Sequence, residues 1–140
     1  MAATIRERIF QQIETSLNGI AGIVTLERER PEPFSREECP AINIEPVSDI
    51  PQQVTVPRTS WNLSINIQLQ LRDEEQSSAA DPFIAEIHSR LMADHSLGGL
   101  AVDINAGEVH FSRFDGDATV CLIDMNFVVE YQTSANDLTV

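Results

Sequence analysis

Between Trp61 and Leu71, apolar and polar residues alternate without interruption. A period of two predicts a β-strand with one face on a core and the other face turned outward. The outward row contains only amides and a hydroxyl: Asn62, Ser64, Asn66, Gln68 and Gln70. A strand face that merely meets water usually carries charged residues, so this uncharged row is a candidate surface for another chain.

The length favours one domain over residues 1–140, ending in a short flexible tail from about residue 133. No apolar run approaches the roughly 18–20 residues that span a membrane. The first ten residues carry Arg6, Glu7 and Arg8 but no apolar segment typical of a signal peptide. We therefore expect a cytoplasmic protein that makes no membrane contact.

The charge is strongly acidic, with 22 Asp and Glu against 9 basic residues and a formal net charge of −13. Every basic residue is arginine, which excludes lysine nucleophiles and Schiff bases. Proteins that bind nucleic acid present a basic stripe to the phosphates, and this chain has none. An acidic surface would let DNA pass without binding it.

The pattern along the chain predicts two amphipathic helices and several strands. Thr4 and Glu7 form a capping box before a helix from about Ile5 to Asn18. Asp81 and Pro82 predict the start of a second helix, which Gly98 and Gly99 follow. Strands are expected at Ile23–Arg30, Ala41–Val47, Trp61–Leu71, Leu100–Ile104, Glu108–Phe114 and Asp117–Tyr131.

The connections between these elements are rich in proline, glycine and aspartate. Pro31–Pro40 and Ser48–Pro57 are expected to be exposed loops, and either could reach a partner. Asp115-Gly116 is typical of a tight hairpin. The whole pattern predicts an α+β fold, with a single antiparallel or mixed sheet packed by two amphipathic helices.

Residues that carry chemistry are scattered. His88 and His95 are seven positions apart, a spacing that does not suit a metal site, and His110 has no evident partner. The chain has no nucleophile elbow and no glycine-rich phosphate loop. Cys39 and Cys121 are expected to be reduced. We therefore expect no catalytic site, no metal and no cofactor.

Charged residues at the ends of the expected strands suggest contacts between subunits. Opposite charges at strand ends suit the contacts of a ring, in which the bases of one subunit meet the acids of the next. Ordinary surface ion pairs are an equally good account of any single arginine. The candidate interface residues are Arg28, Arg30, Arg58, Arg72 and Glu74, together with Asn62, Ser64, Asn66 and Gln68 of the uncharged row.

The order of elements and several short motifs resemble a known family. The motifs are Cys39-Pro40-Ala41-Ile42-Asn43-Ile44, the run Leu97-Gly98-Gly99-Leu100-Ala101-Val102-Asp103-Ile104, and the ending Phe127-Val128-Val129-Glu130-Tyr131-Gln132-Thr133 with Asn136-Asp137-Leu138 after it. This combination resembles the tail terminator, or tail completion, proteins of long-tailed phages and prophages (minor tail protein U-like). The resemblance covers nearly the whole chain.

The resemblance implies a structural role without catalysis. Proteins of this family form a ring, commonly a hexamer, that caps the tail tube, stops its polymerisation and presents a surface to the head–tail connector. The implied partners are other copies of the chain, the tail-tube protein and the connector, with DNA passing through. The implied location is the host cytoplasm during assembly and then the virion tail.

Three other functions remain open from the sequence. A head-closure, head–tail joining or tail-tube protein of the same assembly would show similar charge and compact loops. A small cytosolic ligand-binding module and a hydrolase are the alternatives outside that assembly.

Overall fold

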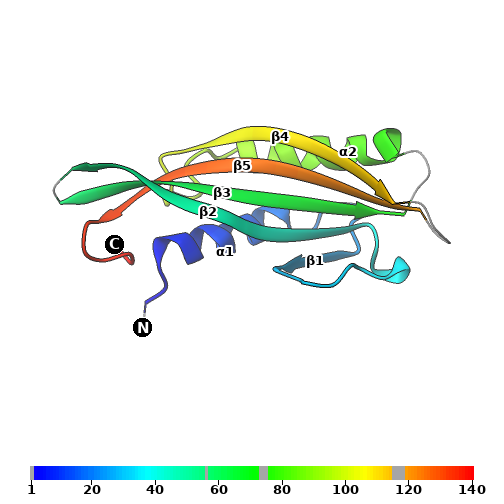
Figure 1. Ribbon diagram of the computed structural model, residues 1–140, viewed down its shortest axis with the longest axis horizontal. Helices are drawn as coiled ribbons and strands as arrows, with labels where there is room; N and C mark the ends of the chain where they lie inside the picture. The colour runs from blue at the N-terminus through cyan, green and yellow to red at the C-terminus, as the bar shows by residue number, and fades with distance from the viewer. Residues whose placement is uncertain (1, 56, 73–75, 115–118) are drawn as a thin grey trace.

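The computed structural model describes residues 2–55, 57–72, 76–114 and 119–140, which form one sheet with two helices on one of its faces (Figure 1). The elements are α1 (Ile5–Leu17), β1 (Thr25–Arg28), the short 3-10 helix η1 (Arg36–Glu38), β2 (Ala41–Thr55), β3 (Arg58–Leu71), α2 (Gln76–Met92), β4 (Asp103–Phe114) and β5 (Val120–Ser134). The strand order is β1-β2-β3-β5-β4. Only the β1–β2 pair is parallel, so the sheet is mixed and the predicted α+β class is confirmed.

The alternating row of β3 forms the floor of the core. Its apolar side chains Leu63, Ile65, Ile67 and Leu69 are fully buried, as are those of β5 opposite them. Ile9 and Ile13 of α1 belong to the same cluster as Ile87 and Leu91 of α2. Helices α1 and α2 therefore lie on one side of the sheet, and no α-helix in the described part of the chain covers the other side (Figure 1).

The first helix agrees with the sequence prediction. The Thr4 hydroxyl accepts a hydrogen bond from the Glu7 backbone N–H at 3.1 Å, which caps the helix start. Helix α1 ends at Leu17, and Gly19 follows with φ at 79°, a conformation that favours glycine.

The second strand is longer than predicted. Ser48–Pro57 was expected to be a loop because of its prolines, but β2 continues through Pro46 and Pro51 to Thr55. Beyond Ile44 the outer edge of β2 has no strand beside it, since β1 pairs only with residues 41–44. Proline is tolerated on such an edge because no ladder donor is needed there. The register also shifts at Pro46/Ser48 and Pro51/Val54, where the strand bulges.

The second helix also begins earlier than predicted. It starts at Gln76, so Asp81 is not an N-cap and Pro82 lies inside the helix. Ala80 is fully buried in the shared core, and this packing stabilises the additional turn.

One continuous strand, β4, replaces the two predicted at Leu100–Ile104 and Glu108–Phe114. The expected turn at Asn105–Gly107 is instead a shift in register between Ala106 and Val109. A Cβ atom on Gly107 would lie 3.1 Å from the Asn126 carbonyl oxygen, so glycine allows the close approach of β5. Strand β1 is shorter than the expected Ile23–Arg30, and Asp115-Gly116 lies outside the described residues.

The last residues fold back against the start of α1. The Ile5 N–H donates to the Leu138 carbonyl at 2.9 Å, and the Arg8 guanidinium donates to the Thr139 carbonyl. The two ends of the chain therefore lie close together (Figure 1). These bonds place the segment that was expected to be a tail beside the helix.

Neighbouring substitutions on β3 test which face is buried. We expect Ile65→Ala to lower the free energy of unfolding by about 2–5 kcal/mol, because it opens a cavity beneath both helices. Ser64→Ala, one residue away on the other face, should change it by less than about 0.5 kcal/mol. Urea unfolding of both variants measures the difference, and equal losses would contradict the one-sided core.

Candidate assembly surface

The sheet face that carries no helix, which we call the open face, is polar along its centre. Asn62, Ser64, Asn66 and Gln68 of β3 lie on it and are half-buried, as the alternation predicts. Carboxylates of the neighbouring strands flank this row: Glu45 of β2 pairs with Asn66 in register, and Asp124 of β5 pairs with Gln68. The open face is therefore acidic at its sides and uncharged at its centre.

The amides of the central row bind one of these carboxylates. The Asn66 Nδ2 and Gln68 Nε2 groups donate to Asp124 Oδ1 at 2.8 and 3.1 Å. Burial raises the pKa of Glu45, and the nearby charge of Asp124 adds to the increase. Neutral amide donors thus fix the Asp124 carboxylate on the open face.

One end of the open face is covered by the segment that leads to η1. Phe34 is buried outside the main core, and its backbone N–H and C=O bond to the Gln70 side chain at 3.2 and 2.9 Å. Arg72 donates to the same Phe34 carbonyl at 2.9 Å. Gln70 is buried by these contacts, so it differs from the four half-buried members of its row. This contact is not predicted by the sequence, because Phe34 is a single aromatic residue among prolines and charged residues.

Arg30 organises the same segment. Its guanidinium contacts Glu27 at 2.7 Å and Glu38 at 2.5 Å, and it lies 4.5 Å from the centre of the Phe34 ring. The pKa of Arg30 is raised, first by the hydrogen bond with Glu38. Arg30 also lowers the pKa of Glu38 to about 2, aided by the Ser35 backbone N–H.

The other interface candidates are placed as follows. Arg28 contacts Glu7 at 2.8 Å and Glu14 at 3.1 Å on α1, and it lies over the Phe10 ring. Arg58 is exposed at the start of β3, and Glu74 lies outside the described residues. Arg28, Arg30 and Arg72 thus make contacts within the chain, and their role between subunits stays a prediction.

A second polar cluster, which the sequence did not indicate, joins α1, β2 and β5. Arg6 Nε lies 2.8 Å from Asp49 Oδ2, and the Tyr131 hydroxyl donates to the same oxygen. Trp61 stacks on the Tyr131 ring with a centroid distance of 6.4 Å. Burial, and next the hydrogen bond to Asp49, raise the pKa of Tyr131 to about 12. The sequence did not indicate a role for Asp49, because the segment Ser48–Pro57 was expected to be an exposed loop.

The residues that suggest catalysis or metal binding do not come together. Among residues 2–55, 57–72, 76–114 and 119–140, no three His, Cys, Asp or Glu side chains gather as a metal site would require. Cys39 and Cys121 are not joined in a disulfide, and burial raises the pKa of Cys39. No helix in the part of the chain that the structure describes is long and apolar enough to cross a membrane.

The Leu97–Leu100 motif, which carries part of the resemblance, serves to connect α2 to β4. Leu97 is buried, and Leu97, Gly98 and Gly99 all have positive φ. Asp94 accepts hydrogen bonds from the backbone N–H groups of Ser96 and Gly98 at 3.1 and 2.8 Å. The motif therefore shapes a tight turn and presents no reactive group.

Comparison with known proteins identifies the fold and no family. No protein-family model matches the chain, and neither does any curated protein. A chain in the virion of a native gene transfer agent (GTA) particle has a similar fold, with a TM-score of 0.54 and 11% identity over 93% of this chain and 96% of that one. Another solved structure, without a functional description, has a TM-score of 0.53 and 12% identity over 89% and 93% of the two chains.

Titration of the single tyrosine tests the Arg6–Asp49–Tyr131 cluster. Because Tyr131 is the only tyrosine, the ultraviolet absorbance of tyrosinate reports it alone. We expect a midpoint near 12, and Asp49→Asn should lower it while leaving it above 10, because burial is the larger cause. The raised pKa means that this contribution to stability is complete below pH 10 and is lost between 10 and 12. A wild-type midpoint at 10 would contradict the cluster.

Titration of Glu38 tests the segment that covers the open face. The pKa is lowered from 4.5 to about 2, so the contribution of the ion pair is present above pH 4.5 and is lost as the pH falls towards 2. Arg30→Gln should raise the Glu38 midpoint in an NMR titration of side-chain carboxylates. Arg36→Gln, in the same exposed segment, is the control and should leave it unchanged. Equal midpoints in the wild type and Arg30→Gln would refute the pairing.

Proposed function

We propose that this chain is a structural component of a phage or phage-like virion, and specifically a tail terminator. In this role it forms a ring that caps the tail tube, stops tube polymerisation and provides the surface for head attachment. The observation that carries the proposal is the fold, which matches a chain of a gene transfer agent virion over nearly the full length of both chains. The resemblance of the Leu97–Ile104 run and of the chain ending supports the terminator role in particular.

The arrangement of the sheet suits a ring. A closed ring needs a heterologous contact, in which one surface of each subunit meets a different surface of the next. This sheet has helices on one face only and two different edge strands, so its faces and its edges are all distinct. A subunit of this kind can present its open face to one neighbour or channel and its helices to another.

The charge suits a ring through which DNA passes. The net charge of −13 and the carboxylates Glu45 and Asp124 on the open face would repel phosphates. Arg30 and Arg72, at the covered end of that face, lie against groups of the same chain. The role we propose is therefore structural, with the tail-tube protein and the head–tail connector as partners and no catalysis.

Tail length in the producing phage or prophage tests the proposal. Deleting the gene should give tails of uncontrolled length without heads, because nothing then caps the growing tube. Electron microscopy of lysates measures the length distribution, and a plasmid copy of the wild-type gene should restore a single length. Tails of normal, uniform length in the deletion strain would refute the terminator role.

A plasmid copy encoding Ser89→Ala, at an exposed position of α2, should also restore uniform length, because this substitution leaves the fold intact. Ile65→Ala should restore it poorly at high temperature, since it destabilises the core. Equal restoration by both variants at every temperature would show that the function does not require this fold.

A further inference from the structure

The sheet has two edges without a neighbouring strand among the described residues, and they differ. Strand β4 forms one edge over Asp103–Phe114 and contains no proline and no lysine, the residues that commonly protect an edge. Strand β1 forms the other edge over Thr25–Arg28. The outer half of β2 is also free, but Pro46 and Pro51 remove hydrogen-bond donors there. The pair of edges able to form a new ladder is therefore β4 and β1.

These two edges lie at the same level of the sheet. The pairing registers connect Leu26 of β1 to Phe111 of β4 in one row across all five strands: Leu26, Ile42, Leu69, Ile123, Phe111. The next row runs Glu27, Asn43, Gln68, Asp124, His110. An in-register contact between adjacent copies would therefore place residues of one row opposite each other.

The strand directions also agree. Strand β1 is parallel to β2, and each following strand in the order β2-β3-β5-β4 reverses direction. Strand β4 of one copy beside β1 of the next would therefore be antiparallel. Residues directly opposite in such a pair share a face of the sheet, as Leu26 and Phe111 do already.

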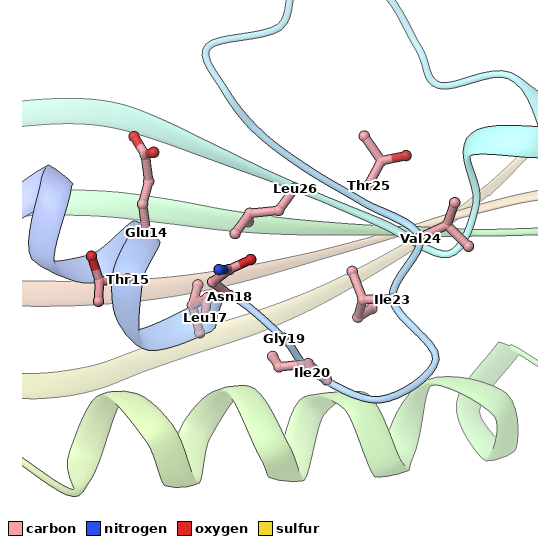
Figure 2. A pocket seen from close by; sticks show the side chains of 10 residues that line it. All are labelled: Glu14, Thr15, Leu17, Asn18, Gly19, Ile20, Ile23, Val24, Thr25 and Leu26. Carbon is pink, nitrogen blue, oxygen red and sulfur yellow. The ribbon is translucent and has the colours of Figure 1, made fainter.

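The side chains at the two edges are complementary. On the helix side of β4, Phe111 and Val109 are 46% and 38% exposed, which is unusual for large apolar groups. On the helix side of β1 there is a hollow of about 450 Å³ between the last turn of α1 and the strand. Figure 2 shows the apolar side chains around this hollow: Leu17, Ile20, Ile23, Val24 and Leu26.

The charges beside these apolar groups are opposite in sign. Arg113 is exposed and lies on the same face of β4 as Phe111, because it pairs with Cys121 of the buried row. Glu14 of α1 lines the hollow beside β1 (Figure 2). In the register that joins Leu26 and Phe111, Arg113 would fall opposite Val24, whereas Glu14 lies at the other end of β1, where Arg28 contacts it at 3.1 Å.

We propose that β4 of one copy pairs antiparallel with β1 of the next, so that the sheet continues from subunit to subunit and Phe111 enters the hollow beside Leu26. This inference rests on the proposed ring and specifies its interface. The partner is a second copy of this chain, and the contact is heterologous because β4 and β1 are different surfaces.

A pair of introduced cysteines tests the register. Glu27 and His110 are both exposed on the open face and lie in one row of the sheet. The double variant replaces both with cysteine, as Glu27→Cys and His110→Cys. In the double variant, oxidation should link each chain to two neighbours and give a ladder of multimers on a denaturing gel. The control, Glu27→Cys with Asn105→Cys, places the second thiol about 13 Å further along β4, too far for a disulfide. The wild-type protein gives the background from Cys39 and Cys121.

The outcomes separate this interface from the proposed function. A ladder only in the Glu27/His110 variant supports the β4–β1 contact. Multimers in size-exclusion chromatography with no ladder above the control would overturn this interface but keep the ring. A chain that is monomeric at every concentration and gives no ladder would overturn both.

Substitution of the exposed aromatic residue is an independent test. Phe111→Asp should raise the concentration at which multimers dissociate about tenfold or more, because it removes the apolar contact with Leu26 and places a carboxylate in a hollow that Glu14 already lines. Phe114→Asp is the matched control, since Phe114 is also exposed on β4 but faces the other side of the sheet, beyond the level of Thr25. Equal effects of the two substitutions would contradict the placement of Phe111.

Discussion

The burial of one alternating row of β3 beneath both helices is the constraint on which the rest of this structure depends. Leu63, Ile65, Ile67 and Leu69 form the floor of a core that α1 and α2 close from the same side. Because the period of a strand is two, every intervening residue must then face the opposite way. The polar open face is the direct consequence of this one-sided packing.

The charge and exposure of the polar row of β3 depend on the adjacent strand β5 and the Phe34 segment as well as on its own residues. Asn66 and Gln68 donate to Asp124, so the uncharged row fixes a carboxylate of the adjacent strand. At one end of the row, the Gln70 side chain and Arg72 both donate to the Phe34 carbonyl. Only the other four residues of the row remain open to a partner. The surface available for assembly is thus smaller than the row of amides suggests.

The sequence was informative where a pattern alone decides the structure. Thr4 with Glu7, and the alternation through β3 and β5, predicted α1 and two central strands because local periodicity and capping determine these elements. The sequence was misleading where the structure of a segment depends on the elements that pack or pair beside it. Pro46 and Pro51 suggest a loop until β2 is known to have a free edge, and Ala80 extends α2 only because the core covers it.

The candidate surface was predicted only in part for the same reason. The polar row of β3 follows from the alternation of the sequence. The contacts of Arg30 with Glu38 and Phe34 form because the segment after β1 folds back on itself, and no periodic pattern in the sequence predicts this. Asp49 meets Arg6 and Tyr131 across three elements that are distant in the sequence. Contacts of this kind depend on tertiary structure, so composition and spacing did not reveal them.

We propose that this one-sided sheet assembles with copies of itself. Native mass spectrometry of the purified chain over a range of concentrations, alone and with tail-tube subunits, tests it most directly. We expect one defined multimer of this 15.6 kDa chain, with the mass of a closed ring. A monomer at every concentration, even with tail-tube subunits present, would contradict it.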